Sequence, residues 1–172
     1  MRFDGSAHRT MLRSDSFFFM QAGLFLERAD STARILDVKY HLLLPTGARV
    51  GGGLDYYQWS SILRSVSSVT AYRWVYHDSL QPWNIADLLI LNEQMPRSLA
   101  SCYDNLAEAL DDLALAYGTQ GEAQRTARSI LAKLRNAEIS NIFQNIGLHE
   151  FLTQIISDNS RLGMAIHRQY LT

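Results

Sequence analysis

Apolar residues recur along the chain at the three- and four-residue spacing of α-helices, and no window alternates apolar and polar residues as a half-buried strand does. The prolines stand at 45, 82 and 96, which leaves long stretches without a helix breaker. The longest stretch predicts a helix over about residues 15–44, and another helix is predicted from Arg97 to Tyr117, stopped by Gly118. Shorter helical segments are predicted at about 6–12, 56–66, 68–80, 83–91, 122–136, 138–144 and 148–171. We therefore expect an all-α, multi-helix bundle with one long N-terminal helix.

The composition is that of a compact folded protein. The 172 residues are 47% hydrophobic and 19% charged, which excludes a disordered chain and predicts one domain over residues 1–172. A single cysteine, Cys102, excludes an internal disulfide scaffold. The net charge of -1 argues against a dedicated binder of nucleic acid or of anionic membranes. The sequence lacks a signal-peptide pattern and an apolar run of the about 20 residues that span a bilayer, so we expect a cytoplasmic protein.

The long predicted helix carries a stripe of charged residues. Glu27, Asp30, Arg34, Asp37 and His41 follow one another at spacings of three and four, within a sector about 80° wide on a helical wheel. Apolar residues flank this charged stripe on both sides, which is typical of a buried helix, so we expect the stripe to face the bundle interior or a cleft. Two interpretations stay open. The stripe is an internal ion-pair network, with local Asp30–Arg34 and Arg34–Asp37 pairs and a partner for Glu27 from another helix, or it is a ligand-binding or catalytic cleft.

The same helix carries a family resemblance. Residues 25–45 read FLERADSTARILDVKYHLLLP and resemble the signature helix of the bacterial alpha-E family, whose pattern begins YLERAD or YLERAE and continues x-T-A-R-L/I-L-D-V. Shorter similarities occur at 52–59, 63–67, 71–73, 95–99 and 166–170. The charged residues that match the signature are Glu27, Arg28, Asp30, Arg34 and Asp37.

The resemblance implies an all-helical bacterial protein from a family without defined biochemistry. Such proteins are commonly encoded beside circularly permuted ATP-grasp ligases and transglutaminase-like peptidases, which implies a role in forming or processing peptide or amide bonds with an ATP-grasp-type ligase as partner. Family proteins have two related halves, and this chain resembles the second half only. We therefore expect an apolar face, covered by the first half in those proteins, to be covered here by self-association into a homo-oligomer.

Three other residue sets bear on function. Asp37 and His41 are four residues apart but lack a third ligand at a suitable spacing, so neither a metal nor a cofactor is expected. Cys102 falls on an apolar helical stripe and is expected to be a buried thiol. Tyrosine and tryptophan are enriched at protein interfaces, so the aromatic residues between 56 and 83 form a possible partner surface. Its members are Tyr56, Tyr57, Trp59, Trp74 and Trp83.

The leading hypothesis for function is a non-catalytic helical accessory module that binds a protein partner, through the aromatic residues or through the charged stripe. The alternative is an enzyme of amide or peptide chemistry with a carboxylate–arginine site on the long helix, built on Glu27, Asp30, Arg34 and His41. A third interpretation is a structural half-protein without a retained function. The sequence contains no recognised catalytic motif, so no catalytic residue is assigned.

Overall fold

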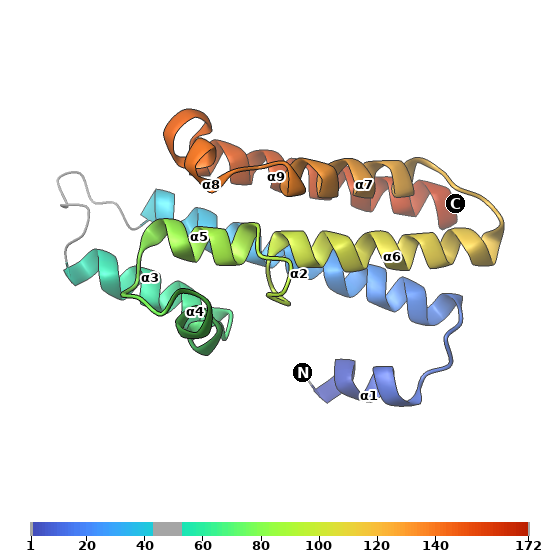
Figure 1. Ribbon diagram of the computed structural model, residues 1–172. Helices are drawn as coiled ribbons and strands as arrows, with labels where there is room; N and C mark the ends of the chain where they lie inside the picture. The colour runs from blue at the N-terminus through green and yellow to red at the C-terminus, as the bar shows by residue number, and fades with distance from the viewer. Residues whose placement is uncertain (1, 43–52, 172) are drawn as a thin grey trace.

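Four long helices carry the architecture, shown in Figure 1 as a computed structural model that describes residues 2–42 and 53–171, with side chains described over 5–38 and 56–171. They are α2 (Asp15–Leu42), α6 (Leu99–Tyr117), α7 (Glu122–Arg135) and α9 (Leu148–Tyr170). Helix α2 packs on α6 and α9, and α7 packs on the same two helices, so the four close a ring around one interior. Every regular element in the described ranges is helical, which confirms the prediction of an all-α bundle.

Neighbouring helices of this ring run in opposite directions. The ring of Tyr117, at the end of α6, lies 6.2 Å from that of Phe19 near the start of α2, and Thr32, further along α2, hydrogen-bonds Arg97 just before α6. The far end of α2 contacts the start of α9 through Asp37 and His149. A short turn, residues 118–121, joins α6 to α7, whereas α3–α5 lie between α2 and α6 in the chain, and α8 and η1 lie between α7 and α9.

The boundaries of α6 show which local signals set the helix ends. The helix begins at Leu99, two residues later than predicted, because Ser98 is the N-cap: its hydroxyl oxygen accepts the Ser101 N–H at 3.0 Å and its hydroxyl donates to the Asn92 carbonyl at 2.6 Å. The helix ends at Gly118, whose φ of +69° is the left-handed conformation that glycine adopts without strain. The predicted stop is therefore confirmed.

The remaining helices cover parts of this ring. They are α1 (Arg2–Thr10), α3 (Gly53–Ser65), α4 (Val69–Tyr76), α5 (Pro82–Ile90), α8 (Ile139–Asn141) and a π-helical turn η1 (Ile142–Ile146). Helices α3–α5 gather at the end of the bundle where α2 finishes and α6 starts (Figure 1). Helix α4 stops before the predicted position because His77 takes a left-handed conformation, with φ of +51°. The last predicted residues of the long helix, 43 and 44, lie outside the described ranges.

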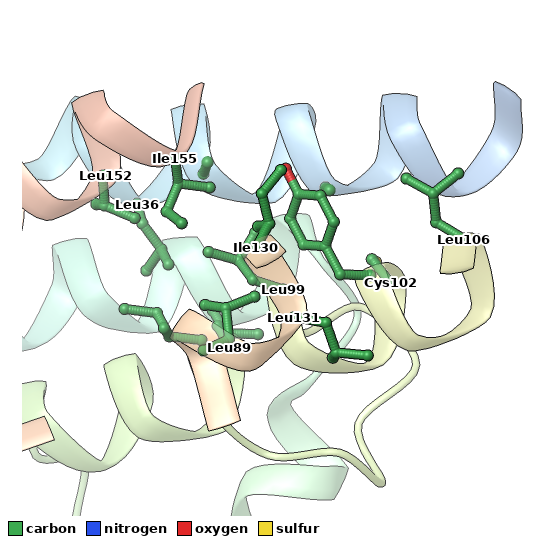
Figure 2. Packing of buried hydrophobic residues seen from close by; sticks show 14 of the residues in the cluster. Leu36, Leu89, Leu99, Cys102, Leu106, Ile130, Leu131, Leu152 and Ile155 are labelled. Carbon is green, nitrogen blue, oxygen red and sulfur yellow. The ribbon is translucent and has the colours of Figure 1, made fainter. Parts of the chain in front are cut away.

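The hydrophobic core is continuous from α2 to α9. Figure 2 shows the close packing of Leu36 from α2, Leu89 from α5 and Leu99 from α6 against leucine and isoleucine side chains of α7 and α9. Helix α2 contributes mostly small residues, among them Ala29 and Ala33, which let its two neighbours approach closely. Within the described residues, no helix is both long enough and apolar enough to cross a bilayer.

Candidate functional site

The backbone next to the Glu27-Arg28 dipeptide of α2 accepts a hydrogen bond from α9, and a residue of α6 supports the donor. The carbonyl just before it, of Leu26, accepts the Asn159 side-chain N–H of α9 at 3.2 Å. The Tyr103 hydroxyl of α6 donates to the other side-chain atom of Asn159, Oδ1, at 2.8 Å. Burial, with the charge of the nearby Asp158, raises the pKa of Tyr103, so this hydroxyl stays a donor. The backbone at the dipeptide is therefore fixed by α6 and α9 together.

A second contact joins α2 to the segment that precedes α6. The buried hydroxyl of Thr32 donates to the Arg97 carbonyl at 2.9 Å. The charges of Arg28 and Arg97 lower the pKa of the nearby Cys102 thiol, and the charge of Glu27 raises it. Burial raises the pKa of Cys102 to about 12 despite these two positive charges. Cys102 is therefore a buried, protonated thiol, as the sequence predicts, and it is not an activated nucleophile.

The charged stripe does not lie inside the bundle. Ala29 and Leu36 turn inward, whereas Glu27 and Arg34 lie on the opposite side of α2 and are exposed. The expectation of a buried stripe is wrong because the core packs on the face of α2 that lies opposite the stripe. Ile35, beside the stripe, still packs against the core, whereas Val38 on the same flank is exposed to solvent.

Two of the stripe's carboxylates have partners. Asp30 Oδ2 lies 2.6 Å from Arg34 Nε, and this hydrogen bond and the charge of Asp30 raise the pKa of Arg34. Asp37 Oδ1 lies 2.6 Å from His149 Nδ1 on α9, so the expected Arg34–Asp37 pair is replaced by a contact between helices.

Three further charged or titratable residues belong to this region of α2: Arg28, which lies beside the stripe, and Glu27 and His41, which belong to it. Arg28 has its guanidinium carbon 5.2 Å from the centre of the Phe25 ring. Glu27 has no hydrogen bond or ion pair among the described residues, and the side chain of His41 lies outside them. Neither Glu27 nor Arg34 lines the groove between α1, α2 and α6 or the groove between α7 and α9. The stripe is thus a partly paired, solvent-facing edge of α2, and its role in a site stays a prediction.

Four of the five aromatic residues predicted at a partner surface are exposed. Tyr56 and Tyr57 on α3, Trp74 on α4 and Trp83 on α5 all face solvent, and Trp74 has 77% of its surface exposed. Trp59 is buried in the core instead, so its place in the predicted surface is wrong. The other four are called the aromatic set below.

The sequence interpretation missed the residues that position the dipeptide. Thr32 and Asn159 are polar residues that interrupt apolar helical stripes, and both are buried. A buried polar side chain needs a hydrogen-bond partner, so such an interruption is a usable signal for a contact between helices. Within the described residues, no three His, Cys, Asp or Glu side chains gather to hold a metal ion.

A comparison with models of known protein families identifies the family of this chain. The family model that matches it is Alpha-E, described as a predicted alpha-helical domain with a conserved ER motif, and the match covers residues 1–171. Glu27-Arg28 is the only Glu-Arg dipeptide in the sequence and is therefore the counterpart of that motif. Since the match spans nearly the whole chain, the expectation that it corresponds to a second half only is not borne out. No curated protein and no solved structure matches. The chain belongs to the Alpha-E family.

Proposed function

We propose that this protein is a helical accessory module that binds a protein partner through the aromatic set on α3–α5. The observation that carries the proposal is the exposure of Trp74 and Trp83 on two different helices at one end of the bundle. Tryptophan and tyrosine supply large contact areas at low entropic cost and are the residue types that most often dominate binding energy.

The partner we propose is an ATP-grasp-type ligase, because the family resemblance links such proteins to ligases of this class. The module would hold the ligase or its peptide-like substrate during amide-bond formation. We place this complex in the bacterial cytoplasm, the compartment that supplies ATP to such a ligase. A second copy of this chain is the competing occupant of the same surface, in keeping with the expected homo-oligomer.

The alternative, an enzyme built on the charged stripe, has weaker support. A catalytic carboxylate–arginine site needs an enclosed setting in which its charges act at low dielectric. Glu27 and Arg34 instead face solvent and line neither groove.

The proposal is tested by co-purification of the tagged chain with an ATP-grasp ligase from the same organism. Replacing both tryptophans (Trp74→Ser with Trp83→Ser) is expected to weaken the complex by about 2 kcal/mol or more, roughly 30-fold in Kd. Leu115→Ser is the matched control, since Leu115 is an exposed apolar residue near the C-terminal end of α6, and that end lies away from α3–α5 (Figure 1).

Two further outcomes decide between the occupants and the surfaces. If Glu27→Ala abolishes binding and the double tryptophan variant does not, the charged stripe is the contact surface and the proposal fails. If the double variant instead converts a dimer into a monomer by light scattering and leaves ligase binding unchanged, the aromatic set joins two copies of this chain.

A further inference from the structure

The exposed faces of α3 and α4 each carry an arginine together with a member of the aromatic set. On α3, Tyr57 and Arg64 are both exposed, and because they are seven residues apart they share one face of the helix. On α4, Arg73 and its neighbour Trp74 are both exposed. The two helices follow one another in the chain and pack against each other (Figure 1). Two positive charges therefore accompany the aromatic set.

Neither of these arginines has a counter-ion within the described chain. No hydrogen bond or ion pair joins the guanidinium of Arg64 or Arg73 to another described residue, whereas Arg128 on α7 pairs with Asp111 at 2.6 Å. Both lie in the last turn of their helices, where a positive charge interacts favourably with the helix dipole. That interaction does not use the N–H donors of the guanidinium, so they are available to a partner.

The acidic residues of the same segment bond to neutral groups of the chain instead. Between positions 56 and 91 the sequence contains two of them, Asp78 and Asp87. Asp78 Oδ1 accepts the Ser79 N–H at 2.6 Å, and Asp87 Oδ2 accepts the Tyr76 hydroxyl at 2.5 Å. The carboxylates nearest in sequence thus leave the two arginines unpaired.

We propose that the partner meets the aromatic set with an acidic protein segment in which carboxylates stand among apolar side chains. This inference rests on the proposed function and states the chemistry of the partner's contact surface. The carboxylates would accept hydrogen bonds from Arg64 and Arg73, while the apolar side chains would cover Trp74 and Trp83. Arginine, tryptophan and tyrosine together are the residue types enriched among those that dominate binding at protein interfaces.

An anionic membrane is another surface that combines negative charge with apolar groups. Segments that bind such membranes gather roughly four to eight lysines and arginines. Helices α3–α5 contain two, Arg64 and Arg73, and the net charge of the whole chain is -1. Two charges fit the carboxylates of a protein segment better than a continuous lipid surface.

An NMR titration with synthetic peptides tests the inference through the indole N–H signals of the tryptophans. The acidic peptide has three Glu-Leu-Ser repeats and blocked ends, and its two counterparts carry glutamine or lysine in place of glutamate. We expect the acidic peptide to shift the Trp74 and Trp83 signals with a Kd on the order of 1 mM, and to leave the signal of the buried Trp59 unchanged. The glutamine peptide should bind about tenfold more weakly because it lacks the charges, and the lysine peptide more weakly still.

Variants then assign the charge dependence to the two arginines. Arg64→Gln combined with Arg73→Gln should lower the affinity for the acidic peptide about tenfold, to that of the glutamine peptide. Arg64→Lys combined with Arg73→Lys keeps both charges and should stay within about threefold of the wild type. Arg125→Gln is the matched control, because Arg125 is an exposed arginine of α7 without an ion pair in the described structure. Thermal unfolding of each variant verifies that it is folded.

Any of three results overturns the inference. The first is equal affinity for the acidic and glutamine peptides. The second is full affinity for the acidic peptide in the folded double Arg→Gln variant. The third is the absence of a Trp74 or Trp83 shift with the acidic peptide up to about tenfold above the expected Kd. If phosphatidylglycerol vesicles then broaden the same two signals, the surface binds lipid instead.

The ligase complex separates this inference from the proposed function. A complex that is lost in the double tryptophan variant and unchanged in the double Arg→Gln variant would overturn the acidic segment and leave the proposed function standing. A complex unchanged in the double tryptophan variant would overturn the proposed function itself.

Discussion

Gln124 on α7 and Gln21 on α2 are both buried glutamines of a four-helix ring, yet their surroundings differ completely. The Gln124 amide donates to the Leu110 carbonyl at 2.8 Å and to the Tyr170 hydroxyl at 2.5 Å. Its Oε1 accepts the Gly121 N–H and the Gln169 side-chain N–H, both at 2.9 Å. The Gln21 Nε2 has no partner among the described residues.

The carboxylates of these two regions also differ in whether they have partners within the chain. Between α7 and α9, the buried carboxylate of Asp158 is held by Lys133 at 2.7 Å, by Gln154 at 2.9 Å and by Arg161. Between α1, α2 and α6, Glu108 and Asp112 have no such partners in the described structure. The buried carboxylate on the α7–α9 side is satisfied within the chain and stabilises the fold, whereas Glu108 is exposed to solvent.

The largest effect on stability is expected from a substitution of Gln124. Gln124→Met keeps the length of the side chain but removes both donors and the acceptor, so the Gly121 N–H loses its partner and the Leu110 carbonyl loses a hydrogen bond beyond that of its own helix. We expect the free energy of unfolding to fall by about 3 kcal/mol, measured by urea denaturation. Gln94→Met, at an exposed position, is the control. A loss no larger than that of the control would mean that the network around Gln124 contributes nothing to stability.

A smaller effect is expected at Asp158, and it depends on pH. Burial opposes ionisation of this carboxyl, but hydrogen bonds from Lys133, Gln154 and Arg161 outweigh it, so its pKa lies below the ordinary value of 3.8. A lowered pKa in the folded state stabilises the fold above the pKa of the unfolded chain, and this stabilisation disappears as the pH falls through the folded value.

Asp158→Asn should therefore lower the free energy of unfolding by about 2 kcal/mol at pH 7. The difference between wild type and variant should begin to shrink below about pH 4, where the carboxyl of the unfolded chain takes up a proton, and should disappear as the pH falls through the lower pKa of the folded state. Urea denaturation at pH 7, 5, 4 and 3 measures this difference. A gap that stays constant down to pH 3 would contradict an ionised, hydrogen-bonded Asp158.

The smallest effect has the opposite sign. Gln21→Met removes a buried donor without a partner and replaces it with an apolar side chain of similar length, so we expect a gain of about 1 kcal/mol in the free energy of unfolding. The same substitution thus destabilises at Gln124 and stabilises at Gln21. Loss of stability at Gln21 would show that its amide already has a partner in the folded protein.

The helices were predictable because their signals are local. Ser98 and Gly118 set the ends of α6 through contacts within a few residues, and the apolar spacing in between is that of a helix. The aromatic set was partly predictable, but nothing local distinguishes the buried Trp59 from the exposed Trp74.

The side of α2 that faces the core was not predictable from the wheel. Apolar residues lie on both flanks of the charged stripe, and the choice between them depends on where α6 and α9 pack. The pairing of Asp37 with His149 likewise joins residues 112 positions apart, and no spacing rule within one helix anticipates it. Helix content follows from local sequence, while the orientation of each helix follows from contacts across the chain.

The hydrogen bond from Asn159 to the Leu26 carbonyl spans 133 positions. During synthesis at roughly 5–20 residues per second, on the order of ten seconds separate the two residues as they leave the ribosome. During that interval α9 is not yet present to bond the backbone next to Glu27-Arg28 or to pack near the phenylalanines of α2. The Glu27-Arg28 motif is thus synthesised well before the helix that supports it. On a ribosome stalled between α2 and α9, the chain would contain the motif but lack the hydrogen bond from Asn159.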